Sequence, residues 1–326
     1  MNKDHFAGAG SGMPPESMSV PPRKRRLLMV LVIVIVILLA LTAVLGYGLA
    51  GTVTRIRRQT LDDARAWQEA HYDLSWYDPL EKTDYTVSGF DGYVLHVQLL
   101  KNPDDTNRYV IISHGYTDNR FGSLKYAGIY LEQGFNVIVY DLRGHGLNEP
   151  TFCTYSARER KDLMAIIRDS RERYGHPALL GLHGESLGAA TSIAVLDEKP
   201  PVDFVIADCG FADILTVLKG GAKGMHVPPF MMDIASVFAK IRYGYSFNDM
   251  RPIDSLAENR IPILFIHGAE DSFILPEHSE RMSRATKGYS ELRLIPGAPH
   301  AASVLTAPEM YRKYVADFIT ARAAEH

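Results

Sequence analysis

ALLGLHGESLG, residues 178–188, joins a short apolar segment to a glycine-flanked serine and the start of a helix predicted at Ser186–Leu196. Gly184 and Gly188 flank Ser186 in the pattern Gly-x-Ser-x-Gly, which indicates a nucleophile elbow when it lies between a strand and a helix. Glycine lets neighbouring backbone pass closely because it has no Cβ atom. The pattern predicts that Ser186 is a nucleophile at a helix N-terminus, where an oxyanion is favoured. A glycine-rich strand–helix turn without catalysis is the alternative.

Short apolar segments alternate with helical ones along most of the chain. Such alternation is typical of a parallel sheet with helices on both faces. Asp91-Gly92 separates the first two segments and favours a hairpin, which adds an antiparallel edge. We expect strands at Tyr85–Phe90, Tyr93–Leu100, Tyr109–Ser113, Phe135–Tyr140, Ala178–Leu182, Val202–Ala207, Ile263–His267 and Glu291–Ile295. We expect helices at Ser123–Gln133, Ala157–Tyr174, Ser186–Leu196, Glu277–Thr286 and Pro308–Ala321.

A serine hydroxyl needs a base, and in this strand–elbow–helix context the acid and then the histidine follow the serine in the chain. His300 lies in the loop after the last predicted strand, and Asp271 follows the strand before it. In parallel sheets, functional residues gather at the carboxyl ends of the strands. We therefore predict a triad of Ser186, Asp271 and His300. Glu270 is a rival acid, and Asp208 is a more distant one.

An oxyanion hole needs two main-chain N–H donors. The residue after the nucleophile, Leu187, supplies the first donor. The loop after the strand at Tyr109–Ser113 supplies the second, which we assign to Tyr116.

Six motifs in chain order together resemble the α/β-hydrolase superfamily, and more narrowly its serine-aminopeptidase-like group, which includes monoacylglycerol-lipase-like esterases. The resemblance covers about residues 83–322. It implies an α/β-hydrolase fold, with a mostly parallel eight-stranded sheet and helices on both faces. The motifs are HGYTDN (114–119), DLRGHG (141–146), GESLG (184–188), DCGFAD (208–213), HGAEDSFI (267–274) and PGAPH (296–300).

About 40 residues, 214–252, separate two strands more widely than one crossover helix requires. Glycines, prolines, methionines and aromatic residues in this segment favour a small helical cap over the site, and ordinary crossover packing is the alternative. Methionines and aromatic residues would suit an apolar acyl group, because such pockets adapt to their ligands.

The predicted reaction is cleavage of a carboxylic ester through an acyl-enzyme, with no cofactor and no metal ion. A serine aminopeptidase acting on short peptides or aminoacyl amides is the alternative. It would need a buried acid for the substrate ammonium, for which Asp213, Asp233 and Asp249 are candidates. A non-catalytic, tethered binding module is a further alternative.

Residues Leu27–Ala50 carry no charge and are almost entirely apolar. As a helix they would extend about 36 Å, enough to cross a hydrocarbon core of about 30 Å. We expect a single transmembrane helix here, preceded by a disordered, basic-ended tail (1–26) and followed by a juxtamembrane linker or helix (51–82). A cleaved signal peptide is the alternative.

Four basic residues (23–26) precede this helix, and three follow it closely, at positions 55, 57 and 58. The excess of one charge favours a cytoplasmic N-terminus, which places the catalytic domain on the extracytoplasmic side. Lys+Arg number 35 and Asp+Glu 38, so a net charge of −3 gives no electrostatic reason to expect nucleic acid binding. Two cysteines are too few for a disulfide framework. The sequence does not specify an oligomeric state.

Overall fold

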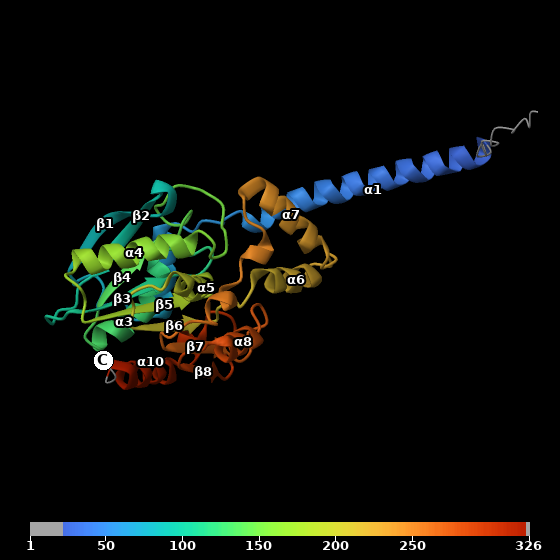
Figure 1. The fold of residues 1–326 in the computed structure, drawn as a ribbon. Helices are drawn as coiled ribbons and strands as arrows, with labels where there is room; N and C mark the ends of the chain where they lie inside the picture. The colour runs from blue at the N-terminus through green and yellow to red at the C-terminus, as the bar shows by residue number, and fades with distance from the viewer. Residues whose placement is uncertain (1–21, 324–326) are drawn as a thin grey trace, which may run out of the picture. The chain divides into compact units, whose positions relative to one another are not determined.

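The computed structural model describes residues 22–323, so the predicted tail up to residue 21 lies outside it. An eight-stranded sheet has the strand order β1-β2-β4-β3-β5-β6-β7-β8 (Figure 1). β2 pairs antiparallel with both β1 and β4, and the remaining strands are parallel. The strands are β1 (Lys82–Ser88), β2 (Val94–Leu100), β3 (Arg108–Ser113), β4 (Asn136–Tyr140), β5 (Leu179–Glu185), β6 (Phe204–Asp208), β7 (Ile263–Gly268) and β8 (Ser290–Ile295).

The hairpin between β1 and β2 forms at the predicted dipeptide. Asp91 and Gly92 have φ values of 57° and 72°, which favour aspartate and glycine over branched side chains. The main-chain N–H of Gly89 donates to the Tyr93 carbonyl oxygen at 2.8 Å and closes the turn. The predicted antiparallel edge is therefore present.

Side chains alternate between two cores, one on each face of the sheet, because successive strand residues point to opposite sides. In β3, Ile111 contributes to the core beneath α4, α5 and α8, whereas Val110 and Ile112 contribute to the core beneath α3 and α10. Both faces are thus covered, as the apolar strands require. The main helices are α2 (Leu61–His71), α3 (Leu124–Glu132), α4 (Glu159–Arg173), α5 (Leu187–Ala194), α8 (Glu277–Ala285), α9 (Ser303–Thr306) and α10 (Pro308–Ala323).

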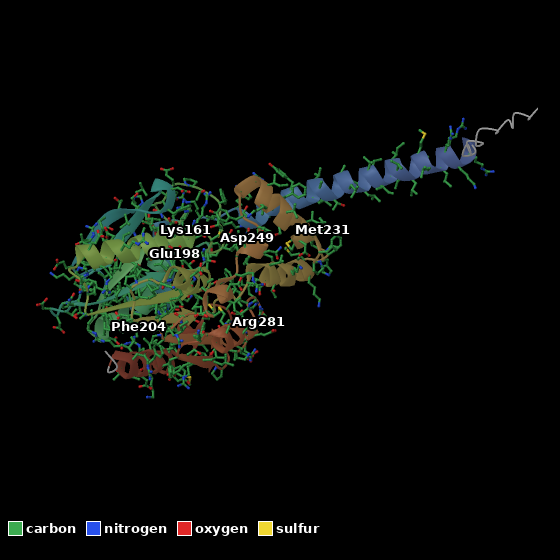
Figure 2. The ribbon with its side chains drawn as sticks, viewed as in Figure 1. Lys161, Glu198, Phe204, Met231, Asp249 and Arg281 are labelled. Atoms are coloured by element: carbon green, nitrogen blue, oxygen red, sulfur yellow. The ribbon has the colours of Figure 1, made fainter. Side chains whose placement is uncertain are left out.

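Two further helices, α6 (Ile214–Gly224) and α7 (Met231–Tyr243), occupy the segment expected to be a cap. They pack on each other through a small buried cluster that includes Ala222, Met231 and Met232. Figure 2 shows Met231 well apart from Phe204 in the sheet. Ile214 and Val217 of α6 and Ala235 and Ala239 of α7 also belong to the core beneath α4, α5 and α8, so the cap extends that core.

Helix α1 (Pro22–Thr54) is longer than the predicted Leu27–Ala50. The basic residues at 23–26, expected in the tail, lie in its first turns. Its most apolar part has a mean hydropathy of 3.5, and the helix is long and apolar enough to cross a membrane. One such helix near an N-terminus also fits a signal sequence.

A boundary between Leu45 and Gly46 divides the described chain into two compact units. The unit that contains the sheet therefore includes the last turns of α1, which the sequence assigned to the anchor, and the predicted linker. Ala50 is fully buried in this unit. A Cβ atom on Gly46 would lie 2.5 Å from Ile234 Cγ2 of α7, so glycine permits the close approach of these two helices.

Candidate active site

The predicted elbow lies between β5 and α5. Ser186 has φ 53° and ψ −110°, a conformation that is strained for a residue with a side chain. A Cβ atom on Gly184 would lie 2.3 Å from the Gly188 backbone, and one on Gly188 would lie 2.0 Å from the Ser113 carbonyl oxygen. The main-chain N–H of Ser186 donates to the Asp208 carbonyl oxygen at 2.8 Å. Close backbone packing thus explains both glycines and holds the serine in this turn.

Three residues from separate loops meet at this elbow. The distance from His300 Nε2 to Ser186 Oγ is 3.1 Å, and that from His300 Nδ1 to Asp271 Oδ2 is 2.6 Å. The rival acid Glu270 is exposed, although it is next to Asp271 in the chain. Asp208 instead accepts hydrogen bonds from Tyr126 and Ser303 on other elements. The structure therefore brings Ser186, His300 and Asp271 together and leaves both rival acids apart from the imidazole.

The Asp271 carboxylate is held by several donors. Its Oδ1 accepts the main-chain N–H groups of Phe273 and Ile274, each at 2.9 Å. Its Oδ2 lies 3.2 Å from Nε2 of His267, in addition to His300. Burial by itself raises the pKa of this carboxyl, but the hydrogen bonds from His267 and His300 hold the pKa well below its usual value. Asp271 is therefore ionised and fixed in orientation at neutral pH.

Two main-chain amides adjoin the serine. Leu187 is the first residue of α5, so its N–H has no partner within that helix. Tyr116 follows Gly115, whose Cβ position would lie 3.7 Å from Ser186 Cβ. Neither amide donates a hydrogen bond to another residue among 22–323. These N–H groups are thus free to bind a ligand oxygen.

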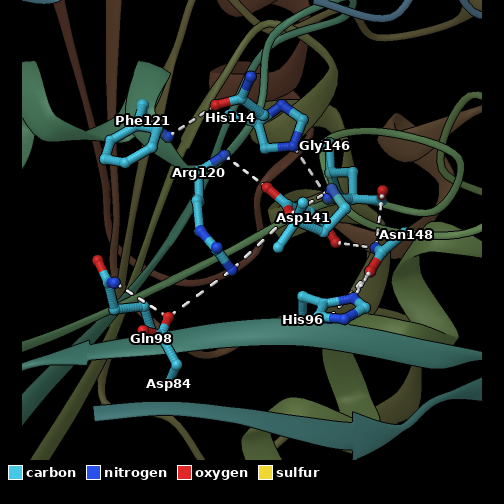
Figure 3. Close-up of polar contacts among 12 residues, drawn as sticks. Asp84, His96, Gln98, His114, Arg120, Phe121, Asp141, Gly146 and Asn148 are labelled. Carbon is cyan, nitrogen blue, oxygen red and sulfur yellow. Dashed lines mark hydrogen bonds and ion pairs between the residues drawn. The ribbon is translucent and has the colours of Figure 1, made fainter. Parts of the chain in front are cut away.

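A buried polar network supports the loop that carries Tyr116 (Figure 3). Nε2 of His114 accepts the Leu142 N–H at 2.9 Å, and Oδ1 of Asp141 accepts the Arg120 N–H at 2.9 Å. Burial lowers the pKa of His114 to about 4, so its ring stays neutral and can accept this bond. Nδ2 of Asn148 donates to the Asp141 carbonyl oxygen at 2.6 Å. The turn after β4 therefore fixes the loop without contributing a group to the triad.

An apolar pocket of about 240 Å³ opens beside the serine. Its walls come from the elbow, the cap helices, the loop after β7 and the last turns of α1. The lining residues are Leu49, Thr52, Val53, Tyr116, Tyr155, Ser186, Leu187, Phe211, Ile214, Val217, Leu218, Gly221, Met225, Val227, Met232, Phe273 and Ile274. This lining contains no Asp, Glu, Lys or Arg. The pocket therefore suits a hydrocarbon chain better than a charged group.

Sequence reasoning missed the contribution of α1 to this pocket. Leu49 belongs to the predicted anchor, and Thr52 and Val53 belong to the predicted linker; neither segment was predicted to line the site. The available signal was the pair Gly46 and Ala50, small residues four positions apart that let another helix approach closely.

Ligand atoms of Cys209, Asp271 and His300 lie within 4.8 Å of one another, a grouping that is compatible with a metal ion. Burial raises the pKa of the Cys209 thiol well above its usual value, so the thiol stays protonated and is a poor ligand. Asp271 and His300 already bond to each other. These donors therefore suit a hydrogen-bonded triad better than a metal site.

The sheet order, the strained elbow serine after β5 and the imidazole beside it define an α/β hydrolase. Comparison with known proteins agrees. A family model described as serine aminopeptidase, S33, matches residues 104–252. The uncharacterized protein YqkD of Bacillus subtilis (strain 168) is 31% identical over 290 residues, which are 86% of this chain and 94% of that protein. The chain belongs to the α/β-hydrolase superfamily and is a hydrolase.

Two further similarities are more distant. The uncharacterized protein YfhR of Escherichia coli (strain K12) is 27% identical over 220 residues, which are 66% of this chain and 71% of that protein. The solved structure of the Pyrococcus furiosus esterase Pf2001 superimposes with a TM-score of 0.62 at 22% identity. The superposition covers 75% of this chain and 92% of the esterase. At this identity the likeness concerns the fold.

Proposed function

We propose that this chain is a membrane-anchored serine hydrolase that cleaves carboxylic esters. The observation that carries the proposal is the line of hydrogen bonds from Ser186 Oγ through His300 to Asp271, at 3.1 and 2.6 Å. A neutral serine hydroxyl becomes nucleophilic when an adjacent base removes its proton, and a third group must orient that base.

The proposed reaction proceeds through an acyl-enzyme. Ser186 Oγ attacks the carbonyl carbon while His300 Nε2 takes the hydroxyl proton. The amides of Leu187 and Tyr116 donate to the resulting oxyanion, and ionised Asp271 stabilises the imidazolium. His300 then protonates the leaving alcohol. A water molecule, deprotonated by His300, releases the acid and restores the serine.

The proposed substrate carries an apolar acyl group, which the pocket beside Ser186 would bind. An ester is preferred to an aminoacyl amide because the three acids considered above as partners for a substrate ammonium are already paired. Asp213 pairs with Arg281 at 2.9 Å, and this arginine is labelled in Figure 2. Asp233 pairs with Lys219, and Asp249 pairs with Lys240. None of the three acids lines the pocket, and each already has a cationic partner.

Membrane anchoring through α1 is part of the proposal. It is supported by an uncharged segment of more than 20 residues with large apolar side chains that are mostly about half exposed. Its basic flanks favour a catalytic domain outside the cytoplasm. Protease accessibility of the domain in intact cells tests this orientation, because a cytoplasmic domain would be protected.

Turnover of a p-nitrophenyl ester by the full chain tests the proposed chemistry. We expect Ser186→Ala to lower kcat by several orders of magnitude, by analogy with other triad serines. The matched control is Ser192→Ala in the same helix. Ser192 is buried and its hydroxyl has no partner among residues 22–323, so this variant should retain activity. Wild-type turnover by Ser186→Ala would contradict Ser186 as the nucleophile, and no turnover by the wild-type chain would favour a binding module.

A further inference from the structure

A second cavity, of about 300 Å³, adjoins His300 on the side of α2. Ser186 does not line it, and its walls differ chemically from those of the apolar pocket. They include Gln68 of α2, Asp118 of the loop after β3, Lys125 of α3 and Glu185 of the elbow. The imidazole beside Ser186 therefore also borders a cavity whose walls combine charged and polar groups with apolar ones such as Trp67 and Leu305.

The carboxamide of Gln68 is the most informative group in this wall. Gln68 is 1% exposed, and its buried Oε1 atom accepts no hydrogen bond from any residue among 22–323. Most buried amides in folded proteins are paired, because an unpaired one loses its bonds to water without replacement. A buried amide that borders a cavity and lacks a protein partner points to a partner inside the cavity.

A buried ion pair lines the same cavity as this amide. Lys125 Nζ pairs with the Glu185 carboxylate, which also accepts a hydrogen bond from the Tyr126 hydroxyl. Burial opposes the charge of Lys125, but the Glu185 carboxylate raises the lysine pKa above its usual value. Lys125 Nζ also lies 3.5 Å from the carbonyl oxygen of Ala301, directly after the triad histidine. Lys125 is therefore charged, and its ion pair with Glu185 borders His300.

Asp118 adds a second carboxyl group to the wall. Burial, with a smaller contribution from the negative charge of Glu185, raises the pKa of Asp118 to about 6. The Asp118 carboxyl is therefore mostly ionised at neutral pH. With one lysine and two carboxylates, the wall disfavours anionic ligands.

We propose that this cavity is the binding site for the alcohol portion of the ester, and that this alcohol is short, hydroxylated and not anionic. The inference rests on the proposed function, in which the leaving oxygen receives its proton from His300 Nε2. The acyl chain in the apolar pocket and the alcohol at His300 then lie on opposite sides of the scissile bond. A hydroxyl can both donate to and accept from the Gln68 amide, whereas a hydrocarbon would leave this amide unpaired.

Two esters of equal shape test the proposal: 2-hydroxyethyl butanoate and propyl butanoate, which differ only in a terminal hydroxyl or methyl group. We expect the full chain to have the higher kcat/KM for the hydroxyethyl ester. Gln68→Met should reduce this preference about tenfold, since one or two hydrogen bonds to the terminal hydroxyl are lost. The control Glu69→Gln alters an exposed neighbour on α2 and should keep the preference.

The thermal stability of Gln68→Met gives an independent readout. Gln68→Met replaces a buried amide, whose oxygen is unpaired, with an apolar side chain of similar shape. We therefore expect a Tm equal to or above that of the wild type. A lower Tm would show that the amide serves the fold and would overturn the inference. Equal kcat/KM for the two esters would overturn it as well, while leaving the proposed ester hydrolysis intact. If the full chain hydrolyses neither ester, the proposed function and this inference are both overturned.

Discussion

Truncation of Val53 to alanine is expected to lengthen the acyl chain that the apolar pocket accepts. Val53 lies in the last turn of α1 and lines the pocket beside Ser186. The substitution removes two methyl groups from the wall and leaves its main-chain carbonyl, which accepts the Tyr155 hydroxyl, in place. The vacated space corresponds to about two methylene groups of a substrate chain.

The size of the effect follows from the burial of those methylenes. Each buried methylene contributes about 0.8 kcal/mol, so two contribute about 1.6 kcal/mol. This corresponds to an increase of about 15-fold in kcat/KM for an ester two carbons longer than the wild-type optimum, relative to the optimum itself. The assay is kcat/KM for p-nitrophenyl esters across a series of acyl lengths.

Val44→Ala is the matched control, because Val44 lies in the same helix, is 69% exposed and belongs to the other compact unit. The control should keep the wild-type optimum. An unchanged optimum in Val53→Ala, with wild-type stability, would refute the assignment of the end of α1 to the acyl pocket.

Four other substitutions have expected outcomes. Asp271→Asn should lower kcat by about 10⁴ if the carboxylate orients the triad base. Because the folded pKa of Asp271 lies below its unfolded value, its stabilisation is present above the ordinary aspartate pKa and is lost as pH falls through the folded value. The Tm difference from wild type should therefore be large at pH 7 and shrink below about pH 3. Gly188→Ala should cost about 3 kcal/mol or more in the free energy of unfolding, since the new Cβ would lie 2.0 Å from a main-chain oxygen. Gly220→Ala, with nothing within 4 Å, should be neutral or stabilising by up to about 1 kcal/mol in the same denaturant titration. Tyr155→Phe removes the hydroxyl bond to Val53 and should lower stability by about 1 kcal/mol in that assay, and a wild-type value would contradict this.

Local patterns allowed most of the fold to be predicted from sequence. Apolar segments bounded by glycine, proline or polar residues located all eight strands to within a few residues. β5 continues beyond its predicted end at Leu182 to Glu185. His183 and Gly184 interrupt the apolar pattern there but still pair with β6, so strand pairing overrides the local signal.

The grouping of Ser186, Asp271 and His300 was also predictable, because the order of strands fixes which loops meet at the carboxyl edge. The walls around the triad were not predictable. For example, the main-chain N–H of Gln59 donates to the Thr117 carbonyl oxygen at 3.2 Å, which brings the segment before α2 onto the loop after β3. Neither residue carries a local signal for this contact.

The same limit applies to the two cavities. The side chains of Leu49 and Gln68 reach the site because α1 and α2 pack around it, and their own sequence pattern indicates only a membrane anchor and an amphipathic helix. Tertiary contacts between distant segments determine these walls. The walls of the two cavities bear on substrate specificity, whereas the elbow motif bears on the reactivity of Ser186.

Covalent labelling of the folded full chain with a fluorophosphonate tests the central claim most directly. Peptide mass spectrometry should find a single phosphonyl adduct on Ser186. The adduct should be absent in Ser186→Ala and form much more slowly in His300→Ala, because the imidazole activates the hydroxyl. A folded protein that acquires no adduct, or acquires it on a different residue, would contradict the account.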